Sequence, residues 1–489
     1  MKSRLLKRLK LPRLHLFDTA GLSRDVRDGL YIGILGVTFC MVFSNVTTGV
    51  AWTGFQRMLG ADSLTLGLIS AIPVAASTLQ IFAAYILEKT RKRRALFLVF
   101  GLISRLAWVG IGLIPLLLPM GEGSPRMAVL MVLLLVSSCG GAFINVSFYS
   151  LMGDLVPLRI RGRYFSARQA ISLLAGIVTG LFVSWLMDRM SGFAGYTVVL
   201  ILAGVFGALD ICCFFFLKWP PMQKPEGRGE TLPAMLKSVL RDSGYMKIVG
   251  YFTLWFFAVN IIAPFNNVYF LEQVKMTFTE ITLLNQVIPN VSTVFIISWW
   301  GRQMDRYGNQ PIVQTAGLYC MILPLAYILT GPRSFLILPF VHVFSGMAWP
   351  ASDLGQQNMY LAKAPAHNRS MYVAVFFAST QLLGTALSNF VGGLLMSGPF
   401  VALESLYPAV PRFSMTRYDF MFLLSSTLRI LCVVLLLPRL RQESDTPAAE
   451  MWRAQLSHAR RAARGLAHGV RVKRARARYH KRREEAEAE

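Results

Sequence analysis

The chain has 489 residues and a formal net charge of +25, yet only 15% of its residues are charged and 54% are apolar. These proportions argue against a soluble multidomain protein, because apolar runs of roughly 20 residues recur along the sequence, each long enough to cross a ~30 Å hydrocarbon core as a helix. The composition therefore predicts an all-α polytopic membrane protein.

Twelve transmembrane helices are expected in chain order. They are predicted at 29–51, 64–87, 95–118, 127–150, 165–187, 196–217, 247–271, 281–300, 312–331, 335–358, 371–396 and 419–437. The basic segment 1–28 precedes them without a short apolar region and cleavage site, which predicts a cytoplasmic segment rather than a removed signal peptide. A middle loop, 218–246, and a basic tail, 438–489, complete the expected organisation.

The distribution of Lys and Arg predicts the orientation. Short loops after even-numbered spans carry 12 Lys and Arg, those after odd-numbered spans carry seven, and both termini and the middle loop are also basic. Because Lys and Arg accumulate on the cytoplasmic side, both termini are expected to be cytoplasmic.

Three sequence landmarks occur twice, in the same order in each half of the chain. The pattern Pro-x-x-x-Arg-(Gly/Ser)-x-Tyr recurs at a shift of 208 residues, a loop after the second span of each half recurs at 217, and an apolar run recurs at 219. The paired segments are 157–164 with 365–372, 84–96 with 301–313, and 209–217 with 428–436. This duplication predicts two six-helix bundles of like fold, 29–217 and 247–437.

The second copy of the loop, GRQMDRYGNQ, resembles the signature loop of the major facilitator superfamily, Gly-x-x-x-Asp-Arg-x-Gly followed by two basic residues. The matching residues are Gly301, Asp305, Arg306 and Gly308. In the first copy the pattern is degenerate and keeps only the basic pair, Lys92-Arg93. The stretch 154–165 is similar to bacterial members of that superfamily whose substrates are mostly unassigned, which implies the bacterial inner membrane. The resemblance implies a transporter with two pseudo-symmetric bundles that rock about a central site.

The resemblance also implies a cytoplasmic gate made by charges at the loop ends. An acid at the end of span 2 or 8 meets a helix N-terminus, which favours carboxylates, and nearby arginines pair with an acid at the end of span 4. The residues expected in this gate are Glu88, Lys92, Asp154 and Arg161 in the first half and Gly301, Asp305, Arg306, Gly308 and Arg369 in the second. The alternative is that these charges only fix the topology.

Polar groups at membrane depth are candidates for the transport path, because such groups are costly in lipid and usually face a cavity or a partner. Asp353 is the first candidate, since it shares one helical stripe with His342, Trp349 and Gln356. The resemblance implies that spans 1, 4, 7 and 10 line the cavity. The expected substrate or ion path comprises Asp353, Arg105, Trp349, Asn145, Tyr149, Asn45, Asn260, Asn266 and Gln356, extended by Thr48 and Asn267.

Each path candidate has a structural alternative. Asn and Thr within spans often only join neighbouring helices, and His342 is expected to be a packing residue. Asp210 and Arg429 hold duplicated positions in peripheral spans and are expected to be structural partners within each half. Pro264 and Pro289 are expected to break spans 7 and 8.

The hypothesis for coupling is that Asp353, together with Arg105, links solute movement to a proton, because a carboxylate in a dry cavity can load and unload one in each cycle. A small-molecule solute and protons are the expected partners. No Cys/His cluster or phosphate-binding loop is present in the sequence, so no metal, cofactor or ATP-driven step is expected. A monomer is expected.

The basic run within 450–483 is predicted to bind anionic lipid, with a solvated tail as the alternative and no nucleic acid expected. Two functions compete: an ion-coupled secondary transporter of a small organic solute, and a transporter-like receptor or scaffold acting through this tail. A membrane enzyme is not expected, because the sequence offers no nucleophile–base set.

Overall fold

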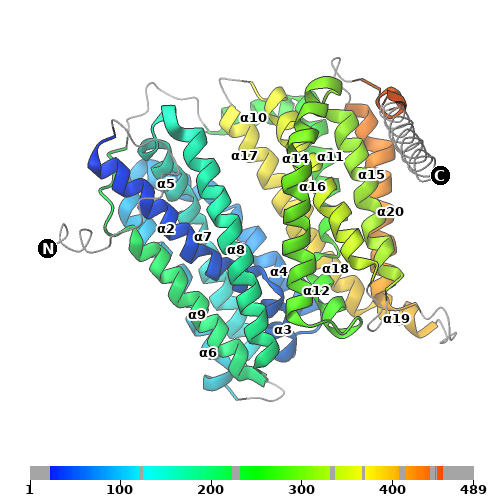
Figure 1. Ribbon diagram of the computed structural model, residues 1–489, viewed down its shortest axis with the longest axis horizontal. Helices are drawn as coiled ribbons and strands as arrows, with labels where there is room; N and C mark the ends of the chain where they lie inside the picture. The colour runs from blue at the N-terminus through cyan, green and yellow to red at the C-terminus, as the bar shows by residue number, and fades with distance from the viewer. Residues whose placement is uncertain are drawn as a thin grey trace, which may run out of the picture.

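The computed structural model describes residues 22–119, 125–190, 192–222, 232–330, 336–365, 369–406, 415–440, 446–447, 449–454 and 457. Every regular element among these residues is a helix. Figure 1 shows two groups of helices side by side, one from each half of the chain.

The first bundle contains six membrane-crossing stretches, two of which are broken into two helices. They are α2 (Arg24–Thr48) with α3 (Val50–Met58), α4 (Ser63–Ser77) with α5 (Gln80–Thr90), α6 (Arg93–Leu117), α7 (Arg126–Leu155), α8 (Arg161–Arg189) and α9 (Gly192–Cys213). The short helix η1 (Leu158–Ile160) joins α7 to α8. The break between α2 and α3 lies at Gly49, whose added Cβ would collide with the carbonyl of Asn45.

The second bundle follows the linking helix α10 (Leu232–Arg241) and repeats the six crossings with more interruptions. They are α11 (Ser243–Asn260) with α12 (Ala263–Glu272), α13 (Phe278–Thr282) with η2 (Leu283–Val287) and α14 (Ile288–Tyr307), α15 (Asn309–Ile328), α16 (Leu338–Lys363), α17 (Arg369–Ser379) with η4 (Thr380–Ala386), α18 (Leu387–Ser397) and α19 (Pro399–Leu406), and α20 (Arg417–Leu431) with η5 (Cys432–Leu436) and η6 (Leu437–Leu440). The crossing that contains Pro264 breaks just before that residue, and a π-helical turn, η2, precedes Pro289. Each of the twelve expected spans coincides with one of these helical stretches.

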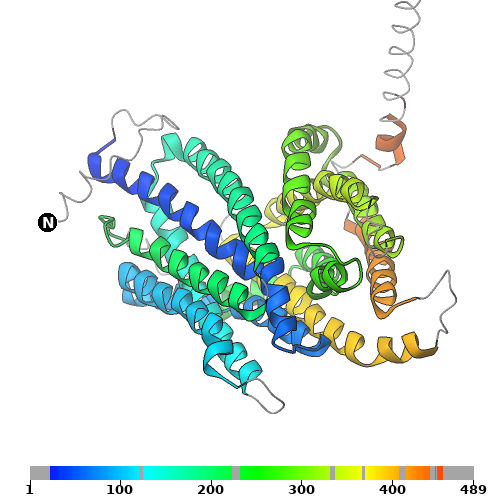
Figure 2. The ribbon, with the colours of Figure 1, turned by 60° about the horizontal axis from the view of Figure 1, so that its bottom comes forward.

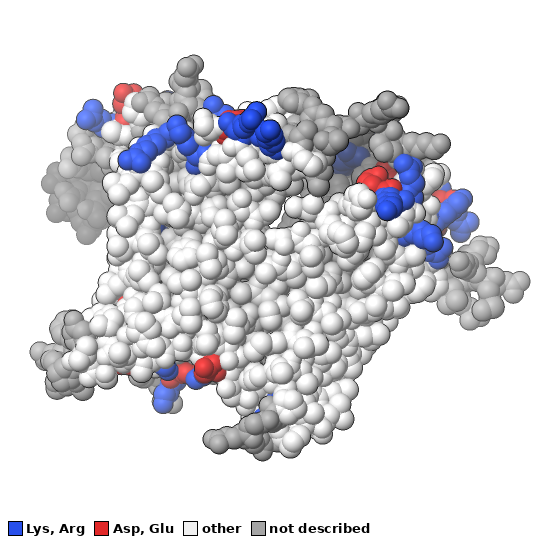
Figure 3. Space-filling model, turned by 180° about the vertical axis from the view of Figure 1, so that it is seen from behind, with Lys and Arg blue, Asp and Glu red and all other residues white. Residues whose placement is uncertain are grey.

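The chain is an integral membrane protein. Among the described residues, eleven helical stretches are long and apolar enough to cross a membrane. The twelfth, α16, has 26 residues and is more polar, because it carries the predicted stripe with His342, Asp353 and Gln356. Figure 3 shows charged side chains gathered towards the two ends of the molecule, with a broad belt of other residues between them.

Each bundle is tied together at the tyrosine of the duplicated Pro-x-x-x-Arg pattern. The Tyr164 hydroxyl, fully buried in α8, donates to the carbonyl of Leu30 in α2 at 3.2 Å. In the second bundle Tyr372 of α17 lies against Tyr245 of α11, whose hydroxyl donates to the Tyr372 carbonyl at 2.9 Å. The repeated tyrosine therefore joins the fifth crossing of each half to the first.

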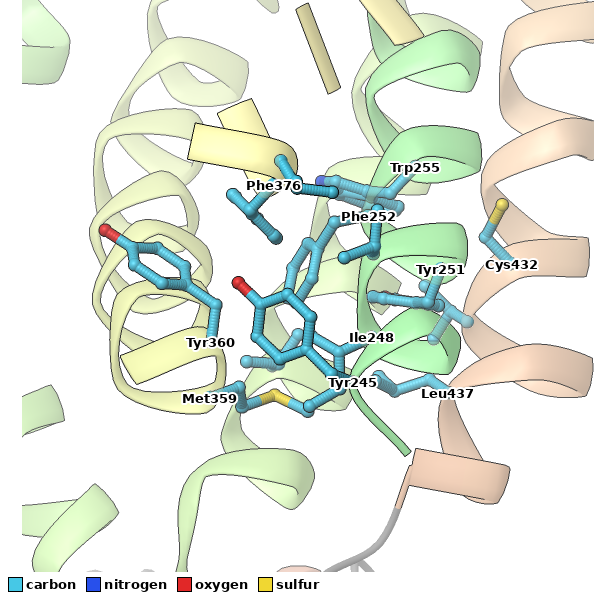
Figure 4. Packing of buried hydrophobic residues seen from close by; sticks show 14 of the residues in the cluster. Tyr245, Ile248, Tyr251, Phe252, Trp255, Met359, Tyr360, Phe376, Cys432 and Leu437 are labelled. Atoms are coloured by element: carbon cyan, nitrogen blue, oxygen red, sulfur yellow. The ribbon is translucent and has the colours of Figure 1, made fainter. Parts of the chain in front are cut away.

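The core of the second bundle is rich in aromatic residues, which come from different helices and meet around α11 (Figure 4). Phe252 contacts Phe376 of α17 at a ring-centroid distance of 5.7 Å, and Phe376 contacts Tyr360 of α16 at 4.5 Å. Aromatic burial of this kind contributes beyond its area, by about 0.5–1.5 kcal/mol per ring pair. The packing fixes α11, α16 and α17 as one unit.

The beginning of the C-terminal tail packs against this bundle. Trp452 donates to the hydroxyl of Thr315 in α15 at 2.8 Å, and Met451 is fully buried. The basic run predicted to bind anionic lipid lies, from residue 458 onward, outside the described residues.

The two bundles touch mainly at one end of the molecule. We call it the closed face: it comprises α3, α12, α13 and the adjoining ends of α4, α8 and α18. The other end, the basic face, carries 89–94, 159–163 and 302–306. The chain reaches the closed face after each odd-numbered crossing, and Figures 1 and 2 show the helices converging there.

Glycines allow the closest approach, between α4 and α18. A Cβ on Gly67 would lie 2.5 Å from the carbonyl oxygen of Asn389 and 3.0 Å from the Cα of Gly393. A Cβ on Gly393 would in turn lie 3.1 Å from the carbonyl oxygen of Ser63. Because these neighbours are backbone atoms, no side-chain rotation can make room. Small residues of this kind let two transmembrane helices pack backbone to backbone.

Candidate functional site

Charged groups join the bundles at the rim of the closed face. Arg57 at the end of α3 pairs with Glu272 at the end of α12, with Nε and Oε1 2.5 Å apart. Asp188 of α8 accepts hydrogen bonds from the backbone N–H groups of Phe278 and Thr279, at 2.8 and 3.0 Å. A carboxylate of the first bundle thus caps the N-terminus of α13 in the second, where the helix dipole favours negative charge.

Neutral polar contacts form a deeper layer between the bundles. Ser184 of α8 and Thr282 of α13 share a hydrogen bond of 2.5 Å between their hydroxyls. The remaining two contacts run from Asn267 to Thr53 at 3.3 Å and from Gln286 to Asn45 at 2.9 Å. Such hydrogen bonds contribute modestly in a membrane, about 0.6 kcal/mol on average, so the face can open without a large barrier from any one of them.

We expect Asp188→Ala to loosen the closed face by removing the cap of α13. Loss of a helix cap costs about 0.5–2 kcal/mol, and here the cost falls only on the closed arrangement. Hydrogen–deuterium exchange of peptides from α3 and α13 should accelerate several-fold, whereas peptides from α6 should be unchanged. Asp242→Ala is the matched control, because Asp242 caps α11 within its own bundle, away from the closed face, accepting from Tyr245 N–H at 2.9 Å. Equal acceleration in both variants would contradict the role of Asp188.

Two cavities lie between the closed face and the basic face. One, of about 390 Å³, lies between the bundles and is lined by Gln80 of α5 and Gln381 of η4. The other, of about 240 Å³, lies within the first bundle and is lined by Arg105, Asn145 and the rings of Trp52 and Trp108. Ser77 and Gln80 line both, so the two cavities adjoin. Amides, hydroxyls and indole rings together can hold a small polar solute.

Arg105, which was expected to act with Asp353 in coupling, pairs with Asp210 of α9, with the nearest N and O atoms 3.6 Å apart. Both side chains are nearly buried, and the guanidinium lies 3.8 Å from the ring centroid of Phe43. A buried arginine in contact with a carboxylate and an aromatic face is neutralised locally. Asp210 is therefore a partner within its own half, as expected, and Arg105 contributes to the cavity of the first bundle.

Asp353 is exposed on α16. It lies nine residues from Phe344, which is also exposed, and nine residues are two and a half turns at 3.6 residues per turn. Asp353 and Phe344 therefore lie on opposite sides of the helix. Trp349 on the same stripe lies 6.5 Å from Trp255 of α11 between ring centroids, and Gln356 is buried.

His342 is buried, and each of its ring nitrogens lies near an oxygen acceptor, to one of which the neutral ring can donate. Nδ1 lies 2.9 Å from the Leu338 carbonyl oxygen and Nε2 lies 3.2 Å from Oδ1 of Asn285 in η2. Asn285 in turn donates to Asn267 at 3.0 Å. The histidine is thus a packed, hydrogen-bonded residue that connects α16 to the layer of amides at the closed face.

The remaining path candidates differ in their surroundings. Asn45 donates to the Gly176 carbonyl at 2.9 Å and belongs to the closed face rather than to a cavity wall. Asn260 donates to the Phe256 carbonyl at 2.8 Å, and Tyr149 is 71% exposed. Asn266 has a buried Oδ1 without a hydrogen-bond partner in the part of the chain that the structure describes. That unpaired oxygen marks a place where a donor from a solute or water can bind.

At the basic face, Asp154 pairs with Arg93, which the sequence-based gate did not include. Their nearest atoms are 2.5 Å apart, and Arg93 is only 3% exposed. Glu88 and Lys92 are exposed, and Arg161 donates to the carbonyls of Gly153 and Val156 at 2.8 and 3.3 Å. The described contacts of this gate thus lie within the first bundle and do not bridge to the second.

In the second loop expected to form the gate, Gly308 has a backbone role. Its φ of 89° and ψ of 175° lie in a region that only glycine adopts readily, where α14 ends and α15 begins. Asp305 and Arg306 are exposed, with the Arg306 guanidinium 5.1 Å from the ring centroid of Tyr307, and Gly301 has open space around it. The Arg369 side chain lies outside the described residues.

The fold and the two adjoining cavities define a class of protein: a membrane carrier built from two six-helix bundles. The model of the family described as the Major Facilitator Superfamily matches residues 34–389, and the chain belongs to this family. No curated protein matches the sequence.

Solved structures share the fold at low identity. The nucleoside transporter NupG is similar at a TM-score of 0.62 and 12% identity, covering 86% of this chain and 100% of that chain. A bacterial homologue of the human lysosomal transporter Spinster, in an inward-facing and occupied conformation, is similar at a TM-score of 0.66 and 13% identity, covering 87% of this chain and 99% of that chain. A D-xylose–proton symporter is similar at a TM-score of 0.62 and 12% identity, covering 86% of this chain and 100% of that chain.

Proposed function

We propose that this protein is a secondary active transporter that moves a small organic solute by alternating access. The observation that carries the proposal is that polar contacts, each breakable at modest cost, close one face of a molecule whose cavities, between and within the bundles, are largely apolar with a few amide and hydroxyl groups. The arrangement favours a carrier over an enzyme, because the cavity residues bind without supplying a nucleophile–base pair. The two bundles, 29–217 and 247–437, are proposed to rock about the central site.

The basic face is proposed to be cytoplasmic, with both termini on that side of the bacterial inner membrane. The excess of Lys and Arg in its loops supports this orientation. The described arrangement then opens inward. The basic run within 450–483 is proposed to contact anionic lipid, and the carrier is proposed to act as a monomer.

Protons are proposed as the coupling ion, with Asp353 as the group that carries them. Support comes from its place on the predicted polar stripe of α16, on the side opposite Phe344, where its carboxylate has no described ion-pair partner. Arg105, which has its own carboxylate in Asp210, is proposed to bind the solute or to shape its cavity rather than to pair with Asp353. The solute is proposed to contact Asn145, Gln80 and Trp108 as well.

A ligand screen followed by transport tests the proposed function. Purified protein is heated with a library of metabolites and drugs, and a compound that binds only the folded form raises the melting temperature. Each hit is then offered to liposomes containing the protein, with and without a pH gradient. We expect saturable uptake that exceeds equilibrium only with the gradient. Hits that bind without crossing the membrane would instead support a receptor.

A further inference from the structure

A cleft at the basic face, separate from the cavities described above, carries unusual charge. It has a volume of about 510 Å³ and lies between the turn that joins α5 to α6 and the segment that follows α9. One wall consists of four consecutive cations, Arg91, Lys92, Arg93 and Arg94. No carboxylate belongs to the described lining of the cleft. Its volume falls in the range typical of small-ligand sites.

The cations of this wall have different roles. Arg93 is buried and neutralised by Asp154, and it also donates to the carbonyl of Pro220 at 2.7 Å. Arg94 donates to the carbonyl of Phe215 at 3.2 Å. These two arginines hold the segment after α9 in place and thereby build the second wall. The charge of Arg94 and the exposed Arg91 and Lys92 is not balanced by any described ion pair, so the cleft has an excess of about three positive charges.

The second wall is apolar and aromatic. Trp219 lies with its ring centroid 5.9 Å from the Arg93 guanidinium and donates to the Phe214 carbonyl at 3.1 Å. Leu98 and Phe215 complete this side. Tryptophan at the boundary between lipid and water is common, because its ring is apolar and its N–H is polar.

Apolar surface continues from the cleft along the two helices that bear it. On α6, exposed side chains recur at helical spacing in Val99, Ile103 and Leu106, and on α9 exposed Leu209 precedes Phe216 of the following segment. Exposed rows of this kind contact lipid chains in a transmembrane bundle. A ligand of this cleft therefore meets cations at its outer end and a hydrocarbon environment at its inner end.

We propose that this cleft binds one anionic phospholipid from the leaflet at the basic face. The phosphate lies among Arg91, Lys92 and Arg94, and an acyl chain follows the exposed ring of Phe215 towards the apolar rows. Basic pockets between transmembrane helices at a membrane surface suit lipid headgroups of this charge. A free phosphate would leave the apolar wall without a partner. The bound lipid bridges the α5–α6 turn and the segment after α9, and so stabilises the first bundle.

Quenching of Trp219 fluorescence by brominated lipids tests the proposal. In mixed micelles, the signal of Trp219 is the difference between the wild-type protein and Trp219→Phe. We expect brominated phosphatidylglycerol to quench this signal at a mole fraction at least fivefold lower than brominated phosphatidylcholine. The double variant Arg91→Asn/Lys92→Gln should lose most of this preference. Asn is chosen because Arg91 has a φ of 53°, which asparagine tolerates well.

The control variant is Lys237→Gln/Arg241→Gln, which removes two exposed cations of α10 near the same face. It should keep the preference for the anionic lipid. Equal loss in the control would show that only overall surface charge matters, and equal quenching by the two lipids in the wild-type protein would remove the basis for a headgroup site. Relief of quenching by 10 mM inorganic phosphate, roughly the concentration at which a weak anion site fills, would assign the cleft to free phosphate. Each of these three results overturns the proposal.

Discussion

Replacing Gly67 by valine is expected to prevent the two bundles from meeting at the closed face. The new Cβ would lie 2.5 Å from the Asn389 carbonyl oxygen, and the obstacle is backbone on α18. Overpacking of this kind costs about 1–3 kcal/mol. This cost applies only to the arrangement in which the closed face is shut. It therefore shifts the equilibrium towards the arrangement in which this face is open, by roughly 5- to 150-fold. Peptides from α3, α12 and α13 should exchange deuterium correspondingly faster, and transport of any identified solute should fall at least tenfold.

Gly250→Val is the control for this prediction. Gly250 lies on α11 with no atom within 4 Å of an added Cβ, so the same change of residue in a transmembrane helix meets open space. Its exchange pattern should match that of the wild-type protein. If Gly67→Val left the exchange of α3 and α12 unchanged, close approach of α4 and α18 would not be needed for closure.

Asp353→Asn is expected to uncouple solute transport from the proton gradient. Asparagine keeps the size and hydrogen-bonding capacity of the side chain but cannot gain or lose a proton at physiological pH. Uptake driven by a pH gradient should therefore fall at least tenfold. Exchange of labelled for unlabelled solute across the membrane, which needs no net proton movement, should persist.

Two further variants make the test specific. Asp210→Asn removes the carboxylate that faces Arg105, and His342→Gln removes the titratable ring on the same helix as Asp353. Both should retain gradient-driven uptake if Asp353 alone carries the proton. Gradient-driven uptake that survived in Asp353→Asn but disappeared in Asp210→Asn would move the coupling role to the first bundle.

The sequence predicted the spans and the internal duplication, because hydrophobic length and repeat spacing are local properties. It also made Asp353 a candidate, since a stripe on one helix is readable from spacing alone, and the role of this residue stays a prediction. The partners were harder to predict: Arg57 and Glu272 are 215 residues apart, and Arg105 and Asp210 belong to non-consecutive helices. Such pairs depend on how the bundles pack.

The choice of Lys92 rather than Arg93 for the gate has a simple physical origin. Neighbouring positions on a helix lie about 100° apart, so a shift of one residue decides which cation turns inward to Asp154. The turn before α6, with Arg91 in a left-handed conformation, sets that direction. The acids of the closed face, Asp188 and Glu272, were detectable only as isolated charges at the ends of odd-numbered spans.

The contacts that shut the closed face and the side chains that line the two cavities are different sets of residues. Arg57, Asp188 and Thr282 belong to the first set, and Gln80, Asn145 and Trp108 to the second. Selection can therefore alter cargo preference by substituting cavity residues while the switching machinery stays intact. The same scaffold can diversify in what it carries without losing the motion that carries it.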